Sequence, residues 1–587
     1  MKAISKIFRS RSAWVLFLVL LIVAIYVSAS LRYRIDLTAE KRFSLNESTK
    51  KLLQGLDSTV DVTVFLTGDL PADYKKLSIA ARDLLSEFRD ISQNRVIFRF
   101  EKPGENLNDS QRLHLYDSLR QVGVVFEQNQ DISSSQQKAT QQLIIPSAIV
   151  QFGNYRPVAV DLRSSRKVFK NYNVVDQEPQ EDKEATLNSA EALLEYKFAD
   201  AIEKLTRKNV PVIAYTLGNG EAGPEIVNDL IQNLRNQYRL AIFDLKQSYP
   251  DPQAINTLLI VKPTEPFTDE DKLKLDQYVM HGGKIIWCID KLFAELDSLM
   301  RSQADFVAFD RNLNLDDILF RYGVRINGDL LQDLNCSKIP LVTGFNADGS
   351  PQMKRFPWPY YPFLSSPNNN AVSKNLDRVL SIFPSSIDTI KAPGIEKTIL
   401  LSSDTTSRLL SSPALVSLKK ILDEISEANF SAYTNSYVPV AVLLEGKFSS
   451  LFANRLTELV KDSVGRSLGK PFLATNEKPT QQIVMSDADI VTNAVSQTTG
   501  PLPMGELPFE NYRFANREFF LNCVDYLTSN SGIFESRNKD FTLRLLDKRK
   551  VADEKAKWQF INIFVPVALI ILFGLFYQWR RKNLFSI

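Results

Sequence analysis

The sequence predicts an α/β protein that is flanked by one transmembrane helix at each end. Two observations indicate this: strand and helix patterns alternate along most of the chain, and the two long apolar runs lie near its two termini. The composition, with 44% hydrophobic and 24% charged residues, is typical of a folded middle region rather than a disordered linker. A net charge of only +3 over 587 residues argues against a nucleic-acid partner.

The apolar runs divide the chain into tails, membrane segments and a middle region. We expect a cytoplasmic tail at 1–12, a transmembrane helix or signal anchor at 13–30, a second transmembrane helix at 559–579 and a cytoplasmic tail at 580–587. The first run has a basic start and ends near small residues, so it also resembles a cleaved signal peptide. Either alternative favours a middle region outside the cytoplasm, with both termini of an uncleaved chain inside it.

Residues 36–208 are predicted to form a thioredoxin-like α/β domain. Hydrophobic patterning predicts strands at 60–66, 96–100, 122–126, 143–152 and 157–162, and helices at 73–91, 110–120 and 189–205. Thioredoxin chemistry requires a Cys-x-x-Cys motif after the first strand, where this chain has Thr-Gly-Asp-Leu-Pro-Ala. The domain is therefore expected to be a scaffold without thiol chemistry.

Residues 209–545 are predicted to form a flavodoxin-like region around a parallel sheet, with an irregular insertion near 330–395. Strands alternate with helices in its first part, which is the pattern of parallel α/β sheets. The predicted strands are 210–217, 240–244, 256–261, 284–290, 398–403, 438–446 and 481–491, and the predicted helices are 225–237, 269–280, 413–428 and 516–527.

The turn Gly218-Asn219-Gly220-Glu221 follows a predicted strand and precedes a helix. Backbone N–H groups at such a position can bind an anion or a sugar hydroxyl. The alternative is an ordinary exposed turn without a ligand, at which substitutions have little effect on folding. One glycine pair has little specificity, so the alternative is favoured.

Asp290 and Asp487 are predicted at strand ends, the edge where open α/β sheets bind ligands. A cation site or a pair of catalytic carboxylates is one hypothesis for them and the nearby Asp489. The favoured alternative is that these side chains cap the following turns. With three cysteines far apart and two histidines, the sequence has few groups for nucleophilic catalysis or for a metal site, and we expect no cofactor and no metal.

Two further segments have weaker patterns. The aromatic and proline-rich run at 355–363, which includes Trp358 and Tyr360, could be a polyproline-like ledge for a partner or a loop packed in a core.

The run from Gly465 to Lys470 imitates a phosphate-binding loop but has three residues between its glycines and Pro471 after the lysine. We therefore expect no ATP hydrolysis by this chain.

Four stretches together resemble one family: VPVIAYTLGNGE at 210–221, LDQYVMHGGKIIWCID at 275–290, VMSDADIVTN at 484–493 and NREFFLNCVDYL at 516–527. They are similar to the gliding-motility-associated ABC transporter auxiliary (substrate-binding-like) protein family GldG. That family's α/β core resembles class I glutamine amidotransferases, without the catalytic cysteine and histidine in matching positions here. Its members often have a histidine where this chain has Asn219, so no role of that histidine can be transferred.

The resemblance implies a non-catalytic auxiliary subunit of an ABC-type transporter complex associated with gliding motility or secretion. It also implies an inner-membrane protein with a periplasmic middle region, and three kinds of partner: a multispanning permease subunit, a cytoplasmic ATPase subunit and the lipid bilayer. Two alternatives remain, a glycan- or peptide-binding module at the 218–221 turn and a hydrolase that uses Asp or Glu.

Overall fold

The chain divides into two compact units, Met1–Lys539 and Asp540–Ile587. The computed structural model describes residues 18–23, 44–130, 141–164, 166, 169–170, 180–181, 183–295, 305–346, 348–368, 370–418, 427–496, 498–510, 512–529, 532–538 and 548–585. Most of the predicted membrane segment at 13–30 lies outside the described residues, of which only 18–23 are helical there.

A four-stranded sheet forms the N-terminal part of the first unit, with the strand order β2-β1-β5-β6. Strand β1 runs parallel to β2 and antiparallel to β5, and β6 is antiparallel to β5. Val60, Val62 and Val64 of β1 are buried because alternate side chains of a strand share one face. The elements are α3 (Glu47–Gln54), β1 (Val60–Val64), α4 (Ala72–Ile91), β2 (Val96–Phe100), α5 (Asp109–Val122), β3 (Glu127–Gln130), β4 (Gln141–Ile144), β5 (Ser147–Phe152), β6 (Val158–Asp161) and α6 (Lys183–Thr206).

A seven-stranded sheet follows, in the order β10-β9-β11-β12-β25-β24-β21. Its first five strands are parallel, and β24 is antiparallel to both of its neighbours. Every residue of β11 is buried, as expected for a strand that is covered on both faces. The elements are β9 (Val212–Leu217), α7 (Asn228–Gln237), β10 (Arg239–Asp244), β11 (Thr257–Val261), α8 (Asp269–Met280), β12 (Lys284–Cys288), β21 (Ile395–Ser402), β24 (Pro439–Gly446), β25 (Thr480–Met485) and α13 (Asn516–Thr528).

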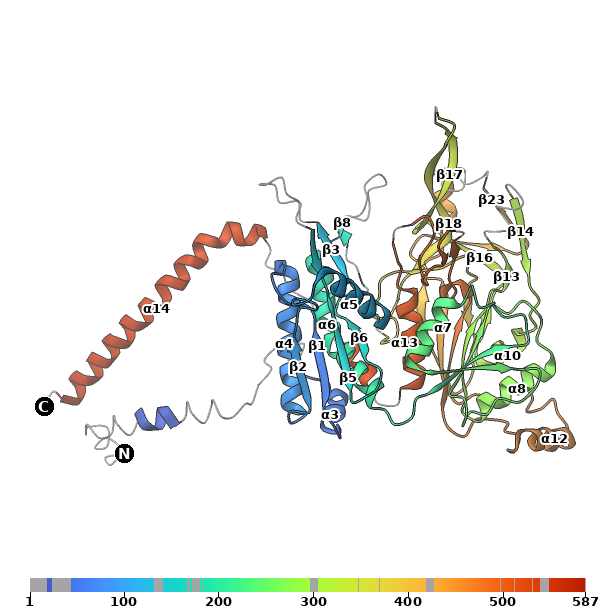
Figure 1. Cartoon of the computed structure of the whole chain (residues 1–587), viewed down its shortest axis with the longest axis horizontal. Helices are drawn as coiled ribbons and strands as arrows, with labels where there is room; N and C mark the ends of the chain where they lie inside the picture. Colours follow the sequence, from blue (N-terminus) through green and yellow to red (C-terminus); the bar gives the residue numbers. More distant parts are fainter. Residues whose placement is uncertain are drawn as a thin grey trace. The chain divides into compact units, whose positions relative to one another are not determined.

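The two faces of this sheet belong to different cores. Ile213 and Tyr215 of β9 pack in one core with α7, α13, α6 and the N-terminal sheet, whereas Ala214 packs in a second core with α8. Figure 1 shows α7 and α13 on the side of the sheet that faces the N-terminal elements, with α8 on the other side. The N-terminal part is therefore joined to the larger sheet through a shared hydrophobic core.

The segment between β12 and β21 is mostly β structure rather than irregular. Its long antiparallel pair, β17 (Cys336–Phe345) and β18 (Pro351–Leu364), projects from the rest of the first unit in Figure 1. The remaining elements are β13 (Leu292–Phe293), β14 (Asp305–Asp310), α10 (Asp316–Tyr322), β15 (Val324–Ile326), β16 (Asp329–Asp333), β19 (Val379–Leu380) and β20 (Ile387–Thr389).

Two sequence predictions about elements are wrong, and one of the two alternatives for a third segment is excluded. The predicted strand at 122–126 does not form, because α5 extends to Val122 and ends at Gly123, whose φ of 103° is left-handed. The predicted helix at 413–428 begins instead as strand β23 (Ala414–Ser417), which pairs with β14, so tertiary pairing overrides a helical pattern. The 355–363 run is part of β18, which excludes a polyproline-like ledge.

The second unit contains the helix α14 (Lys548–Phe585). Within it, Lys557–Asn583 is long and apolar enough to cross a membrane, and it is the one such helix among the described residues. This segment includes the predicted span at 559–579.

Candidate functional site

The carboxyl edge of the seven-stranded sheet brings together most of the residues that the sequence singled out. Strands β9 and β11 are neighbours, and the chain leaves β9 through α7 on one face of the sheet but leaves β11 through α8 on the other face. Open α/β sheets bind ligands at such a switch point. The turn at 218–221 follows β9, Lys262 follows β11, Asp290 follows β12, and Asp487 follows β25.

The side chain of Asn219 is fully buried, so the prediction of an exposed turn is wrong for this residue. Its Nδ2 donates to the carbonyl oxygen of Pro266 at 3.2 Å. Its own carbonyl oxygen accepts hydrogen bonds from the backbone N–H groups of Thr264 (3.0 Å) and Glu265 (2.9 Å). Asn219 therefore ties the turn after β9 to the loop after β11.

The carboxylate of Glu221 occupies the position in the turn that an external anion would take. The Oε2 atom of Glu221 accepts a hydrogen bond of 2.8 Å from the backbone N–H of Asn219. Gly218 and Gly220 have φ values of 122° and 69°, and a Cβ on Gly220 would lie 2.2 Å from Thr264 Oγ1. Because Glu221 already accepts from the turn, this geometry supports a structural turn rather than an anion cradle.

Asp290 meets Asp489 at the ammonium group of Lys262. Lys262 Nζ lies 3.2 Å from Asp290 Oδ2 and 2.7 Å from Asp489 Oδ1. Burial raises the pKa of Asp290, the charge of Lys262 opposes that rise, and Asp489 adds to it. Lys262 has a φ of 51°, a conformation that is uncommon for residues other than glycine. Asp290 also accepts from the N–H of Ala488 at 2.7 Å.

Asp487 holds two segments in place. It accepts hydrogen bonds from Ser381 Oγ (2.5 Å) and from the backbone N–H groups of Ile382 (2.7 Å) and Asp489 (2.8 Å). Burial is the main cause that raises the pKa of Asp487 well above its usual value. Its contact with the Asp489 N–H is the capping interaction that the sequence favoured. Within the described residues, no group of three or more His, Cys, Asp or Glu side chains could hold a metal ion.

Trp358 and Tyr360 lie in a hydrophobic core, with no exposed side-chain surface. Their ring centroids are 5.0 Å apart, and Phe383 packs against Tyr360. Of the two alternatives for the 355–363 run, the structure supports core packing for both aromatic residues. A partner would find neither of them on the surface.

Two of the cysteine thiols are buried, and Lys470 forms an ion pair within the protein. Burial raises the pKa of Cys288 and of Cys523 well above the usual value, which disfavours the nucleophilic thiolate. Gly469 ends helix α12 (Glu458–Leu468) in a left-handed conformation. Lys470 Nζ then pairs with Asp251 Oδ1 at 2.6 Å.

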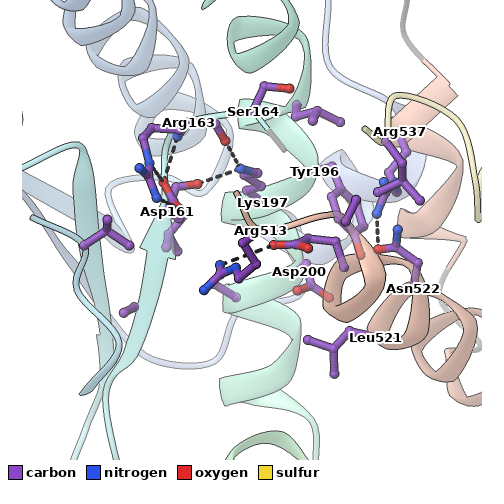
Figure 2. A pocket seen from close by; sticks show the side chains of 18 of the residues that line it. Asp161, Arg163, Ser164, Tyr196, Lys197, Asp200, Arg513, Leu521, Asn522 and Arg537 are labelled. Carbon is purple, nitrogen blue, oxygen red and sulfur yellow. Dashed lines mark hydrogen bonds and ion pairs between the residues drawn. The ribbon is translucent and has the colours of Figure 1, made fainter. Parts of the chain in front are cut away.

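A pocket of about 830 Å³ lies between the N-terminal elements and α13, and sequence reasoning did not identify it. Figure 2 shows charged side chains from β6, α6, α13 and the following short helix η3 (Ile533–Asn538) around it. These residues come from segments that are more than 300 positions apart, for example Lys204 and Asp525. No local spacing in the sequence relates them.

One side of this pocket contains a network around Lys204. Its Nζ lies 2.8 Å from Asp200 Oδ2, 3.1 Å from Asp525 Oδ1 and 2.7 Å from Gln237 Oε1. The hydroxyl of Tyr238 donates to Asp525. Burial raises the pKa of Asp200 to about 6, although Lys204 opposes the rise. The network joins α6 to α7 and α13.

The fold and the site define a mixed α/β protein whose sheet edge is occupied by its own side chains and whose C-terminal helix is apolar. The sequence profile of the family described as "ABC-type uncharacterized transport system" matches residues 210–523, which is more than half of the chain. The chain belongs to this family of auxiliary components of ABC-type transport systems. A domain of unknown function matches residues 39–151.

Individual relatives add little to this assignment. An uncharacterized protein of Borreliella burgdorferi is 18% identical over 556 residues, which cover 94% of each chain. Among solved structures, the mmIFT52 N-terminal domain has a TM-score of 0.29 at 10% identity and aligns over 54% of this chain and 98% of its own. The exo-beta-1,4-mannosidase Op5Man5 from Opitutaceae bacterium strain TAV5 has a TM-score of 0.20 at 10% identity, covering 62% of this chain and 40% of its own. Neither similarity is close enough to assign a fold.

Proposed function

We propose that this protein is a non-catalytic, membrane-anchored auxiliary subunit of an ABC-type transporter complex associated with gliding motility or secretion. The observation that carries the proposal is the combination, in one chain, of a transport-family region at 210–523 with an apolar helix at Lys557–Asn583. A helix of this length and composition anchors the rest of the chain to a bilayer. The large first unit then acts through contacts with other subunits.

The proposal extends to location and partners. The helix at 559–579 and a second segment at 13–30 would place both termini in the cytoplasm and the middle region in the periplasm, at the inner membrane. The partners would be a multispanning permease and a cytoplasmic ATPase. The pairing of Lys470 with Asp251 supports an ATPase on a separate subunit, because the loop near Lys470 was the one phosphate-binding candidate that the sequence offered.

The finer domain assignments belong to the same proposal. The strand order β2-β1-β5-β6, with one parallel and two antiparallel pairings, supports a thioredoxin-like domain at 36–208. Five parallel strands, with α7 and α8 on opposite faces, support a flavodoxin- or amidotransferase-like region at 209–545.

The state of the described side chains supports a non-catalytic role. Asp290 and Asp489 share the ammonium of Lys262, and Asp487 accepts three hydrogen bonds from neighbouring groups. These carboxylates are bonded to groups of the protein itself, which favours a structural role over the hydrolase alternative.

Replacement of residues 559–579 by an oligo-leucine helix of equal length tests the membrane part of the proposal. The native helix should co-purify with a permease and an ATPase, and the replacement should reduce that co-purification at normal expression. Lys470→Ala, which leaves the helix intact, is the control and should co-purify as the native chain does. A native chain that is isolated from mild detergent without transporter subunits would contradict the proposal.

Topology can be tested by labelling of single cysteines in intact cells. Tyr155 is 65% exposed, so Tyr155→Cys provides an accessible thiol in the middle region, while the buried native Cys288 and Cys523 should react little. The reagent is one that does not cross the inner membrane. We expect Tyr155→Cys to be labelled once the outer barrier is opened, and labelling only after lysis would exclude a periplasmic middle region.

A further inference from the structure

The pocket beside α6 has the volume of a small-molecule site, and both charged and apolar side chains line it. Its volume of about 830 Å³ is within the range of roughly 300–1,000 Å³ that small-molecule sites occupy. Charged residues line it together with the apolar faces of Tyr196, Phe514 and Leu521. Figure 2 shows Lys197 on one side of Tyr196 and Arg537 on the other.

Most carboxylates of the pocket already have a cation. The pairs are Asp161 with Arg163 (2.8 Å), Asp200 and Asp525 with Lys204 (2.8 and 3.1 Å), Glu127 with Arg163 (3.9 Å) and Glu518 with Arg513 (3.8 Å). A cationic ligand would therefore have to compete with lysine or arginine side chains that are held in place. The ion pairs leave Glu506 as the one lining carboxylate without a lysine or arginine partner among the described residues.

Lys197 is a cation of the pocket without a carboxylate partner. Its ammonium donates to two backbone carbonyl oxygens, that of Asp161 at 2.7 Å and that of Arg163. An ammonium group has three N–H donors, so one is left for a further acceptor. No carboxylate oxygen of the described residues lies within 4.0 Å of Lys197 Nζ.

Arg537 is a second such cation. Its Nη1 donates to Asn522 Oδ1 and its Nη2 to the carbonyl oxygen of Lys374 at 3.4 Å, and both acceptors are neutral. Its Nε is buried and has no acceptor in the described part of the chain. The guanidinium lies 4.9 Å from the centre of the Tyr196 ring.

The positive charges of Lys197 and Arg537 repel each other. Burial lowers the pKa of Lys197, the carboxylates of Asp161 and Glu518 raise it, and the charges of Arg163 and Arg537 lower it. A negative charge near Lys197 would remove this repulsion. A single negative charge fits better than two, because the carboxylates of Asp200, Glu518 and Asp525 also line the pocket.

We propose that this pocket binds a small organic monocarboxylate, whose carboxylate pairs with Lys197 in the positive field of Arg163 and Arg537. The apolar body of the ligand lies against Tyr196, Phe514 and Leu521. Arg537 belongs to η3, the last described element before α14, so the occupied pocket contacts the segment that leads to the apolar helix. This inference goes beyond the proposed function and does not depend on it.

The first test compares an acid with its neutral amide on the full chain in mild detergent. Phenylacetate, phenylacetamide and inorganic phosphate are titrated by isothermal calorimetry. We expect saturable binding of one phenylacetate per chain, and affinities at least about tenfold lower for the amide and for phosphate, because a charge-assisted hydrogen bond is lost or repulsion is added. Equal affinities for acid and amide, or no binding of phenylacetate, would overturn the proposal.

The second test uses matched lysine variants. Lys197→Met removes the ammonium and keeps the length of the side chain, and it should weaken phenylacetate binding by about tenfold or more. Lys284→Met is the control, because Lys284 is half-buried and donates to the carbonyl oxygen of Leu527 outside the pocket lining. It should bind as the native chain does. Unchanged binding in Lys197→Met would overturn the proposal, and if that variant does not fold, the acid–amide comparison on the native chain decides.

Discussion

Two buried networks in this protein have the same composition and different settings. Lys262 is shared by Asp290 and Asp489 at the edge of the seven-stranded sheet, and Lys204 is shared by Asp200 and Asp525 between α6 and α13. Each contains one ammonium and two carboxylates. The first lies at the ends of three adjacent strands, whereas the second borders a pocket of about 830 Å³.

The difference shows that the position of a charged cluster in the fold determines whether it only stabilises the protein or also borders a ligand site. The register of β11, β12 and β25 fixes the Lys262 network, and the backbone N–H of Ala488 and the hydroxyl of Thr492 donate to its carboxylates. The Lys204 network joins two parts of the chain, and Lys204, Asp200 and Asp525 all line the adjoining pocket. The charged groups at the sheet edge therefore stabilise the fold, while the pocket also contains Lys197 and Arg537, which can pair with a ligand.

The largest expected effect is that of Lys262→Met. The substitution leaves Asp290 and Asp489 buried beside each other without a cation, and removal of one partner of a buried ion pair costs about 3–5 kcal/mol. The free energy of unfolding is measured by urea titration with tryptophan fluorescence. Lys204→Met is the comparison and should cost less, because Asp200 is 22% exposed, whereas Asp290 and Asp489 are 11% and 15% exposed. If Lys204→Met proved more destabilising, the proposed contrast would be wrong.

The next effect is the pH dependence that Asp200 contributes. Its pKa is raised to about 6, above the value of about 3.9 in an unfolded chain, so the folded state binds the extra proton between these values. Stability from this group is present at about pH 4 and is lost as the pH rises to about 6, with a total of about 2–3 kcal/mol. Asp200→Asn should remove this part of the slope.

The measurement for Asp200→Asn is the free energy of unfolding at several pH values between 4 and 7. Asp333→Asn is the matched control, since burial also raises the pKa of Asp333 to about 6 at a site outside the pocket. Both variants should reduce the change in the free energy of unfolding over the same pH range. Only Asp200→Asn should change phenylacetate binding. A native slope retained in Asp200→Asn would show that this carboxylate does not titrate as stated.

A smaller effect is expected for Asn219→Ala. The side chain is fully buried and donates to the carbonyl oxygen of the exposed Pro266, so its loss removes one hydrogen bond, at a cost of about 0.5–1.5 kcal/mol. This corrects the expectation of a neutral surface turn. Thermal unfolding with Glu265→Ala as an exposed control measures the difference, and equal melting temperatures for the two variants would contradict the burial argument.

The smallest effect is expected for Lys470→Ala. The lysine is 27% exposed and pairs with a half-exposed Asp251, and surface ion pairs of this kind contribute about 0–1 kcal/mol. Purified chain should hydrolyse no ATP with or without the substitution. An ATPase activity that disappears in Lys470→Ala would assign a phosphate-binding role to this loop.

Local patterns were enough to predict most of the regular elements of the two α/β parts. Helix α8 has the predicted bounds of 269–280, where a capping box at Thr268 and Asp271 marks its start, and β2 has those of 96–100, where exposure alternates along the strand. The prediction failed for 413–428, where pairing of β23 with β14 outweighs a helical pattern. It also failed for Asn219, because burial by the loop at 264–266 cannot be read from the turn itself.

The sequence by itself determined the alternation of strands and helices, the apolar helix near the C-terminus and the family to which the chain belongs, because each depends on residues close together or on an ordered series of local motifs. The tertiary structure decided which strand-end aspartates share Lys262, that Trp358 and Tyr360 are core residues, and that a charged pocket exists beside α6. These features depend on contacts such as that of Lys204 with Asp525, 321 positions apart, which packing of the shared core brings together.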